Sequence, residues 1–226
     1  MKNIYLILLL LISLNAYCKK NKPSAPNYRA IKTAIEDNNS NYFYPKLLER
    51  YQLNDTTLSI IEYRHLYFGY IFQENYDPDW RCECIDTLVT YYRKEKLNTQ
   101  DCDSIIKYAS LCIAKNPFDL RQLNMIGYAY HLKGQEDIAM TYAIKSAYLK
   151  EAIFSTGTGK KAKKALHVIS VSHEYEIIKS LGLFSSGQEL IGMKYDYMSI
   201  HKNPMNIKGF YFNIEKIFEH RQKMFK

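Results

Sequence analysis

The chain has 226 residues and a formal net charge of +8, and its basic residues are spread along the sequence apart from a cluster at residues 160–164. Nucleic-acid-binding proteins gather their basic residues on one face or stripe, so this spread argues against nucleic acid as a partner and indicates a solvated surface. A chain of this length can bury the core of one domain, or of a large domain with a small appendix.

The N-terminal residues 1–18 have the composition of an export signal. Lys2 precedes an apolar run from Ile4 to Ile12, which small and polar residues follow. The run is shorter than the roughly 20 residues that a membrane-spanning helix needs, so we predict a cleaved signal peptide. Acylation of Cys18, which would anchor the protein to lipid, and an uncleaved anchor are the alternatives. The expected location is the periplasm or cell envelope, with membrane contact only through the signal or a lipid at Cys18.

Residues 19–27 are polar and contain prolines, which predicts a flexible tether. Residues 28–154 have the character of helices. One helix is expected to begin at Ser59, because Ser59 and Glu62 have the spacing of a capping box, in which two side chains satisfy free amides of the first turn. Residues 41–74 are expected to form a degenerate helical hairpin.

Residues 86–151 resemble two tetratricopeptide repeats, each a pair of antiparallel helices. The second repeat has Gly127 and Tyr130 in its first helix and Ala139 in its second, in the order of the repeat consensus. Gly127 and Ala139 are small residues at the point where the paired helices are expected to cross closely. A weaker copy precedes this repeat by about 34 residues, and Pro117 falls where that copy ends. We therefore predict an array of helical hairpins.

The stretch STGTGKKAKK, at residues 155–164, invites comparison with phosphate-binding loops. Gly157 and Gly159 are only two positions apart, and Lys160 is followed by a lysine where the Walker motif has Ser or Thr. A helix also precedes the stretch and a strand follows it, which reverses the order of that motif. We interpret residues 155–164 as a flexible connector whose lysines lie in solvent.

Residues 165–226 change in character. The sequence ALHVISV at residues 165–171 is typical of a buried strand, and residues 173–183 are typical of a short helix. Two further strands are predicted on either side of a turn that ends at Gly209. In the first of them, Tyr195, Tyr197 and Ser199 alternate with Asp196, Met198 and Ile200. The predicted fold class is mainly α, with a small C-terminal antiparallel β element that caps the hairpins.

Four cysteines follow Cys18, namely Cys82, Cys84, Cys102 and Cys112. An even number is compatible with disulfides in an oxidising compartment. Cys82 and Cys84 are too close to pair easily with each other, so we predict a bridge to Cys102 from Cys84, or else from Cys82. Free buried thiols are the competing interpretation. The spacing matches no familiar metal site, and we expect neither a metal nor a cofactor.

The aromatic stretch 59–73 holds the candidate binding residues. They lie close together on one predicted helix, and they are Tyr63, Arg64, His65, Tyr67 and Tyr70. Tyrosine combines a flat apolar ring with a hydroxyl, which suits a sugar or a peptide. Aromatic residues at helical spacing are more often part of a packed core, so core packing is the favoured interpretation of this stretch. No nucleophile, histidine or carboxylate pattern of known catalytic spacing occurs, so we predict no catalytic residue.

Three stretches resemble an uncharacterised family of exported Bacteroidetes proteins. They are YPKLLERY at residues 44–51, EYRHLYFGY at residues 62–70, and a closing YDY…YFNI at residues 195–197 and 211–214. The resemblance covers residues 41–218 and implies export and a single family architecture. It carries no known activity and therefore implies no chemistry.

From these features we expect an exported, non-catalytic interaction or scaffold module of the bacterial envelope. The concave face of the hairpins would hold an unknown protein or peptide partner. The alternative is a carbohydrate-associated binder, or an unrecognised hydrolase, that uses the aromatic helix 59–73.

Overall fold

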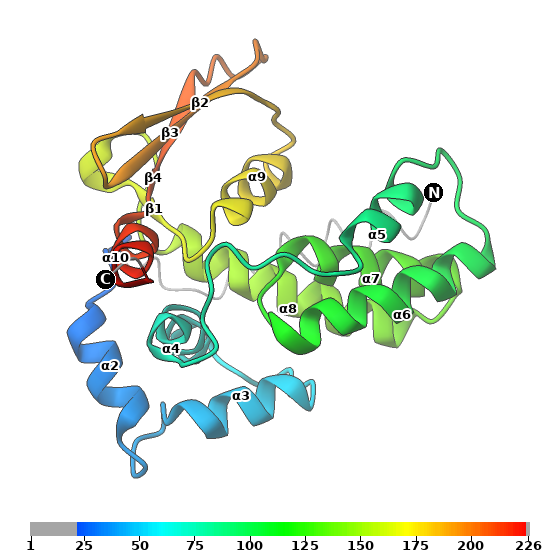
Figure 1. Cartoon of the computed structure of the whole chain (residues 1–226), viewed down its shortest axis with the longest axis horizontal. Coiled ribbons are helices and arrows are strands. Elements are labelled where there is room, and N and C mark those ends of the chain that lie inside the picture. Colours follow the sequence, from blue (N-terminus) through cyan, green and yellow to red (C-terminus); the bar gives the residue numbers. More distant parts are fainter. Residues whose placement is uncertain (1–21, 225–226) are drawn as a thin grey trace.

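The computed structural model describes residues 22–224, and more than half of them are helical (Figure 1). The α-helices are α2 (Tyr28–Glu36), α3 (Tyr44–Gln52), α4 (Ile60–Gly69), α5 (Ile85–Tyr92), α6 (Thr99–Lys115), α7 (Leu120–Leu132), α8 (Glu136–Phe154), α9 (Val171–Ser180) and α10 (Glu215–Met224). The strands are β1 (Leu166–His167), β2 (Ser185–Ile191), β3 (Tyr195–Ile200) and β4 (Gly209–Asn213), and η1 (Tyr70–Phe72) and η2 (Ala162–Lys164) are 3-10 turns. The predicted signal at residues 1–18, with Cys18, lies outside the described residues. Among the helices of residues 22–224, none has the length and apolar character needed to cross a membrane.

Capping side chains explain where several helices begin. The Ser59 hydroxyl accepts the Glu62 amide, and the Glu62 carboxylate accepts the Ser59 amide, which confirms the predicted capping box of α4. Asn98 and Asp101 form the same arrangement at the start of α6. The Asp119 carboxylate accepts two amides of the first turn of α7. Each cap satisfies amides that the helix itself leaves free, at about 1 kcal/mol per cap.

The long helix α8 is central to the helical part of the molecule (Figure 1). Helix α7 packs along α8, α6 packs along α7, and α4 packs against α8 as well, with α2 and α3 against α4. The main core extends from these helices into the sheet, because Leu66, Leu149, Met198 and Phe212 belong to one buried cluster. Helices and sheet therefore share a hydrophobic core.

The four-stranded sheet is mixed and has the strand order β1–β4–β3–β2. Strand β3 pairs antiparallel with β2 and β4, and β1 pairs parallel with β4. Along β3, Asp196, Met198 and Ile200 are buried while the alternate residues are partly exposed. The sheet therefore has an inner face toward α9 and an outer face toward solvent.

The predicted fold class, mainly α with a small C-terminal β element, is confirmed, and so is the antiparallel pair on either side of the turn before Gly209. The sheet differs in detail from the antiparallel prediction. The buried strand predicted at residues 165–171 is only the two-residue β1, and it pairs parallel with β4. Strand β2 was not predicted, because it buries no residue and so shows no apolar alternation. Helix α10 was not predicted either.

The predicted flexible tether is wrong for residues 22–27, because specific contacts hold them. The amide of Ser24 donates to the carbonyl of Ser155 at 2.9 Å. The guanidinium of Arg64 contacts the Ser155 hydroxyl and donates to the Ser24 carbonyl at 3.2 Å. The N-terminal lead is therefore attached to the end of α8.

The connector at residues 155–164 is also ordered by hydrogen bonds and is not the flexible link that was predicted. The amides of Thr158 and Gly159 both donate to the carbonyl of Lys164, at 3.0 and 2.8 Å, which closes a loop. A Cβ on Gly157 would lie 2.4 Å from that carbonyl oxygen, so only glycine permits the close approach. The lysines at positions 160, 161, 163 and 164 are exposed, as expected.

Candidate functional site

The tyrosines of the aromatic helix α4 lie in the core. Tyr63, Tyr67 and Tyr70 are only 2, 0 and 4% exposed. The Tyr63 ring stacks on Tyr148 with 5.0 Å between ring centroids, and the Tyr70 hydroxyl donates to a backbone carbonyl. A ligand-lining role for these three tyrosines is therefore wrong, because their rings are enclosed by protein.

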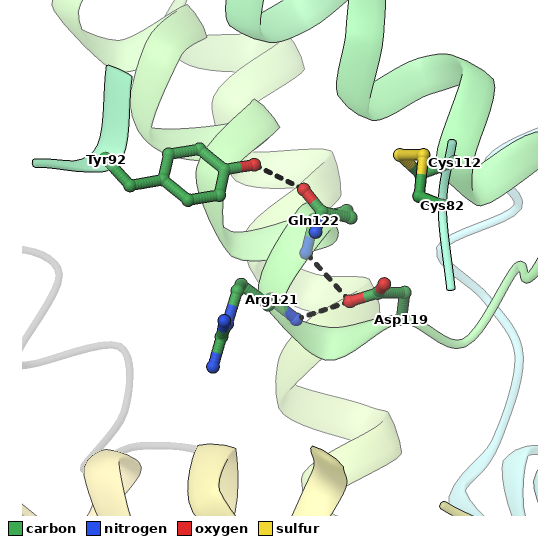
Figure 2. The surroundings of a disulfide bond; sticks show 6 residues. All are labelled: Cys82, Tyr92, Cys112, Asp119, Arg121 and Gln122. Atoms are coloured by element: carbon green, nitrogen blue, oxygen red, sulfur yellow. Dashed lines mark hydrogen bonds between the residues drawn. A yellow bond between two sulfur atoms is a disulfide. The ribbon is translucent and has the colours of Figure 1, made fainter. Parts of the chain in front are cut away.

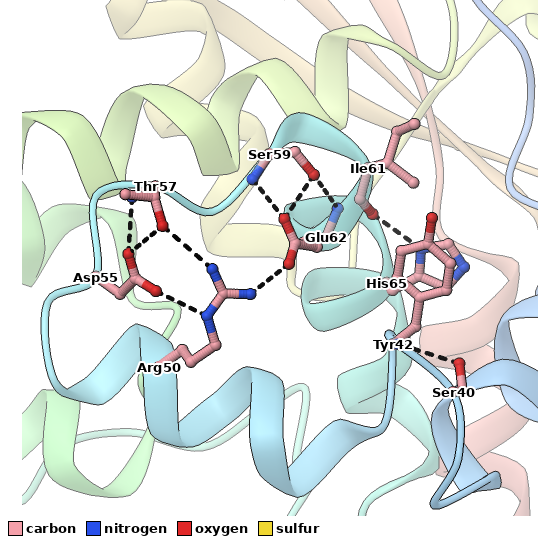
Figure 3. A network of polar contacts seen from close by, with 9 residues as sticks. All are labelled: Ser40, Tyr42, Arg50, Asp55, Thr57, Ser59, Ile61, Glu62 and His65. Carbon is pink, nitrogen blue, oxygen red and sulfur yellow. Dashed lines mark hydrogen bonds and ion pairs between the residues drawn. The ribbon is translucent and has the colours of Figure 1, made fainter.

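The side chains of Arg64 and His65 are partly exposed, but both make contacts within the protein. Arg64 holds the N-terminal lead, as described above. The His65 ring stacks on Tyr42 with 3.9 Å between centroids, and its Nδ1 donates to the Ile61 carbonyl at 2.8 Å (Figure 3). Burial lowers the pKa of His65, so the ring is neutral near pH 7. The five predicted binding residues therefore do not form an open site.

Figure 3 also shows an ion-pair network that joins α3 to the capping box of α4. The Arg50 guanidinium donates to Asp55 at 2.7 Å and contacts the Glu62 carboxylate. Hydrogen bonds from Thr57, and then from Arg50, lower the pKa of Asp55 to about 2. All of these groups satisfy one another, so the network has a structural role.

Three of the four residues predicted to pack the hairpins, Gly127, Tyr130 and Ala139, lie between α7 and α8. A Cβ on Gly127 would lie 3.2 Å from the Cβ of Tyr142 and 3.5 Å from the carbonyl oxygen of Ala139. The Tyr130 ring stacks on that of Tyr142 with 5.9 Å between centroids. Pro117 lies between α6 and α7, and its carbonyl accepts the Tyr51 hydroxyl at 2.9 Å. These four predicted residues are therefore packing residues of the helical part.

The disulfide joins Cys82 to Cys112, with 5.3 Å between their Cα atoms (Figure 2). The predicted bridge to Cys102 is wrong, and Cys84 and Cys102 are free thiols. Cys102 and Cys112 are both on α6, ten residues or about 15 Å apart along the axis, so one segment cannot reach both. Cys112 faces the cluster that holds Cys82, whereas Cys102 packs in a separate cluster with Ile105.

Figure 2 shows that the same region is fixed by polar contacts around the start of α7. The Asp119 carboxylate accepts the amides of Arg121 and Gln122, both at 3.1 Å. The hydroxyl of Tyr92, on α5, donates to the side chain of Gln122. These contacts fix the position of α7 against α5. They therefore also fix the direction in which the exposed side chains of α7 point.

One face of α7 is partly covered by α9 and partly open. Arg121 donates to the carboxylate of Glu176, on α9, at 3.1 Å, and Asn124 donates to the same carboxylate at 3.4 Å. Tyr128 and Leu132 continue this face at helical spacing, and they are 50 and 44% exposed. The face thus accepts one helix at its N-terminal end and leaves two large apolar side chains in solvent at the other.

The outer face of the sheet carries a group of partly exposed aromatic side chains. Tyr197 of β3 and Tyr211 of β4 are directly opposite each other, with 4.7 Å between ring centroids. A Cβ on Gly209 would lie 2.5 Å from the Cζ of Tyr197, so the ring of Tyr197 lies over this glycine and along the sheet. Tyr195 continues the row, and Glu189 of β2 is opposite Tyr197. We call these residues, with Ser199, the outer tyrosine face.

On the inner face of the same sheet two carboxyl groups are buried together. Glu174 of α9 and Asp196 of β3 are 0 and 4% exposed. Burial, and then the charge of Asp196, raises the pKa of Glu174 to about 9, and burial raises the pKa of Asp196. The pair therefore shares a proton at neutral pH. The Gln188 amide donates to Asp196 at 2.5 Å and to Glu174 at 3.3 Å.

This carboxyl pair is enclosed by the protein and is not open to a substrate. In residues 22–224 no three His, Cys, Asp or Glu side chains are placed to hold a metal ion together. An open depression along α2, beside Arg29, Thr33 and Asp37, has no buried polar group converging on it. Two exposed features that could serve recognition are the free end of the α7 face and the outer tyrosine face.

Sequence reasoning missed both surfaces for different reasons. The alternation of Tyr195 and Tyr197 along β3 was visible in the sequence, and it was the signal that these rings share one face. Gly209 gave no such signal, because its role depends on the neighbouring strand. Tyr128 and Leu132 have the spacing of any amphipathic helix, so the sequence alone does not separate a free face from a packed one.

The fold and these surfaces define a mainly helical domain with a small mixed sheet and with exposed faces suited to binding. The chain belongs to the family described as Domain of unknown function (DUF4919), whose model matches residues 29–223. The matched range runs from α2 to α10 and so includes the helices and the sheet. No curated protein and no solved structure matches the chain.

Proposed function

We propose that this protein is an exported, non-catalytic interaction module of the bacterial cell envelope, from a Bacteroidetes family with tetratricopeptide-like hairpins. Its free α7 face would hold an amphipathic helix of a partner protein. Nucleic acid is not the expected partner, and contact with the membrane would be limited to the signal or a lipid at Cys18. Repeat-like helical arrays present extended surfaces of this kind.

The observation that carries the proposal is the continuity of the α7 face. Its N-terminal end already binds a helix of the same chain, α9, through Arg121 and Asn124. One turn beyond Asn124 the same face exposes Tyr128 and then Leu132. An amphipathic helix laid along this stripe would bury both side chains, which is a common mode of helix-in-groove recognition. Aromatic anchors of this type contribute much of the energy of protein interfaces.

The enzyme alternative receives no support from the aromatic helix. The rings of Tyr63 and Tyr67 are buried, and Arg64 and His65 are engaged by Ser155 and Tyr42. A hydrolase would need an open cleft with opposed carboxylates. The carboxyls that lie together, Glu174 and Asp196, are enclosed by α9, the sheet and Gln188.

The test compares Leu132→Glu with Leu111→Glu, a matched control on α6 where the leucine is 54% exposed. Proteins cross-linked to the wild type in envelope preparations are identified, and the contacting segment is synthesised as a peptide. We expect the peptide to become helical on binding and to lose affinity about tenfold or more with Leu132→Glu, because a charge would be buried in the contact. Leu111→Glu should bind as the wild type does.

Equal binding by both variants would overturn the proposal. So would a protein that recovers no partner and instead hydrolyses members of a glycan panel.

A further inference from the structure

The outer tyrosine face combines three aromatic rings with unused hydrogen-bonding groups. Burial alternates along β3, so Tyr195 and Tyr197 lie on the opposite face from Met198 and the core. Tyr211 joins them from β4, where it is paired with Tyr197. Figure 1 shows the sheet at the top of the molecule, with α9 and the helical array on one side of it. The rings on the other side are partly exposed.

The orientation of the Tyr197 ring is set by Gly209. The Cβ that any other residue would add at this position would lie 2.5 Å from Tyr197 Cζ and 2.6 Å from its hydroxyl oxygen. The ring therefore reaches over the backbone of β4 at Gly209. It lies beside Tyr211, with 4.7 Å between the ring centroids and 47° between the ring planes. The two rings together form an aromatic surface on the outer face of the sheet.

The polar groups on this face are uncommitted. Within residues 22–224 the hydroxyls of Tyr195, Tyr197 and Tyr211 make no hydrogen bond, and Glu189 makes neither a side-chain hydrogen bond nor an ion pair. Buried tyrosines elsewhere behave differently, because the hydroxyls of Tyr51 and Tyr76 each donate to a backbone carbonyl. The outer face thus presents three hydroxyls and a carboxylate to an external ligand.

Beside the ring row the sheet is open at Gly187. Gly187 of β2 is opposite Ser199 of β3, which is in turn opposite Gly209 of β4, the glycine that the Tyr197 ring covers. No atom lies within 4 Å of the position that a Cβ on Gly187 would take. The surface at Gly187 does not enclose a small molecule but can accommodate a chain lying on it.

From these features we propose that the outer tyrosine face binds a polysaccharide. The apolar face of a sugar ring would stack on Tyr197, with Tyr211 beside it, because aromatic rings with a polar handle accommodate such amphipathic ligands. Sugar hydroxyls would donate to the Glu189 carboxylate and exchange hydrogen bonds with the tyrosine hydroxyls and Ser199. The chain would continue over the open surface at Gly187. This surface is separate from the α7 face and goes beyond the proposed function.

The test is affinity gel electrophoresis of the purified protein in gels that contain xylan, mannan, laminarin, hydroxyethylcellulose or dextran. We expect at least one of these polysaccharides to retard the wild type. Tyr197→Ala should weaken that retardation roughly tenfold, since a stacking ring is removed. Glu189→Gln, at an exposed position that leaves the fold intact, should weaken it severalfold. Tyr128→Ala, which removes a more exposed tyrosine on α7, is the control and should have no effect.

Two results overturn the proposal. One is that none of the five polysaccharides retards the protein. The other is retardation that Tyr197→Ala and Glu189→Gln both leave at the wild-type value. A gel with polyuridylic acid tests base stacking on the same rings, and retardation there alone would also contradict a polysaccharide ligand. The α7 proposal stands or fails independently, because its variants lie on another surface.

Discussion

The hydroxyl of Tyr67 lies 2.7 Å from the Nδ1 atom of His173, and this hydrogen bond joins two residues that are 106 positions apart. Tyr67 belongs to α4 and His173 to α9, so the contact connects the helical part to the unit that carries the sheet. Both side chains are fully buried or nearly so. The amide of Ile169 donates to the same hydroxyl, which leaves the hydroxyl proton for His173. Burial lowers the pKa of His173 to about 4, so its ring is neutral.

We predict that Tyr67→Phe destabilises the protein by about 1–3 kcal/mol, because it leaves a buried imidazole nitrogen without a partner. The free energy of unfolding is measured by urea denaturation. Tyr195→Phe is the control, since the Tyr195 hydroxyl makes no hydrogen bond within residues 22–224, and its unfolding should match the wild type. Equal stability of the Tyr67 variant and the wild type would show that the contact contributes nothing.

Glu174 predicts a pH dependence of stability. Its pKa is raised from 4.5 to about 9 in the folded protein, so between these values the folded state keeps a proton that the unfolded state has released. The contribution of Glu174 therefore stabilises the fold at low pH and declines as pH rises through this window, by at most about 1.4 kcal/mol per pH unit. Glu174→Gln should flatten this slope in urea titrations from pH 5 to 8.

The control for this pH series is Glu189→Gln, at an exposed carboxylate on the other face of the sheet. It should keep the wild-type slope. If Glu174→Gln also keeps it, the shared proton is absent.

We expect loss of the Cys82–Cys112 bridge to cost about 3 kcal/mol, because the bond closes a loop of 30 residues and restricts the unfolded chain. The measurement compares the urea midpoint of a Cys82→Ser, Cys112→Ser double variant with that of the wild type. A Cys84→Ser, Cys102→Ser double variant is the control and should retain the bridge. Alkylation under denaturing conditions, read by mass spectrometry, should label Cys84 and Cys102 and spare the bridged pair. Labelling of Cys112 would contradict the assignment.

Two glycines predict different responses to the same substitution. Gly134 has a φ of +71° and open space around it, so Gly134→Ala should cost about 1 kcal/mol through backbone strain. Gly127 lies against α8, so Gly127→Val should cost about 1–3 kcal/mol through overpacking. Asparagine variants distinguish the two causes, because asparagine tolerates positive φ. In urea denaturation, Gly134→Asn should recover much of the stability that Gly134→Ala loses. Gly127→Asn should recover none of the stability that Gly127→Val loses.

Interactions between residues close together in the sequence made a large part of the fold predictable. The pair Ser59 and Glu62 located the start of α4, because a capping box needs only residues three positions apart. The alternation from Tyr195 to Ile200 identified β3, although it did not show which of the two alternating sets is buried. Strand β2 was missed, since its residues are exposed on both faces and carry no apolar period.

The candidate site depended more on contacts between distant residues. The spacing of aromatic residues on α4 is the same whether they line a pocket or fill a core. Only the packing of α8, α9 and the segment before α7 showed that Tyr67 is enclosed. The disulfide depended on which turn of α6 faces Cys82, which the spacing of four cysteines does not determine. The aromatic surface on the sheet depended on Gly209 lying beneath a ring from the adjacent strand.

The buried carboxyl pair also has a consequence for how the sheet assembles. Side chains alternate along β3, so an alignment error of one residue would turn Asp196 outward and Tyr197 inward. Glu174 would then lose the neighbouring carboxyl, and Gln188 would lose its closer acceptor, at 2.5 Å. Only the native alignment places Asp196 beside Glu174 and Gln188, so we expect these contacts to disfavour the misaligned pairing. Alkaline conditions, which ionise both carboxyls, would reduce this preference.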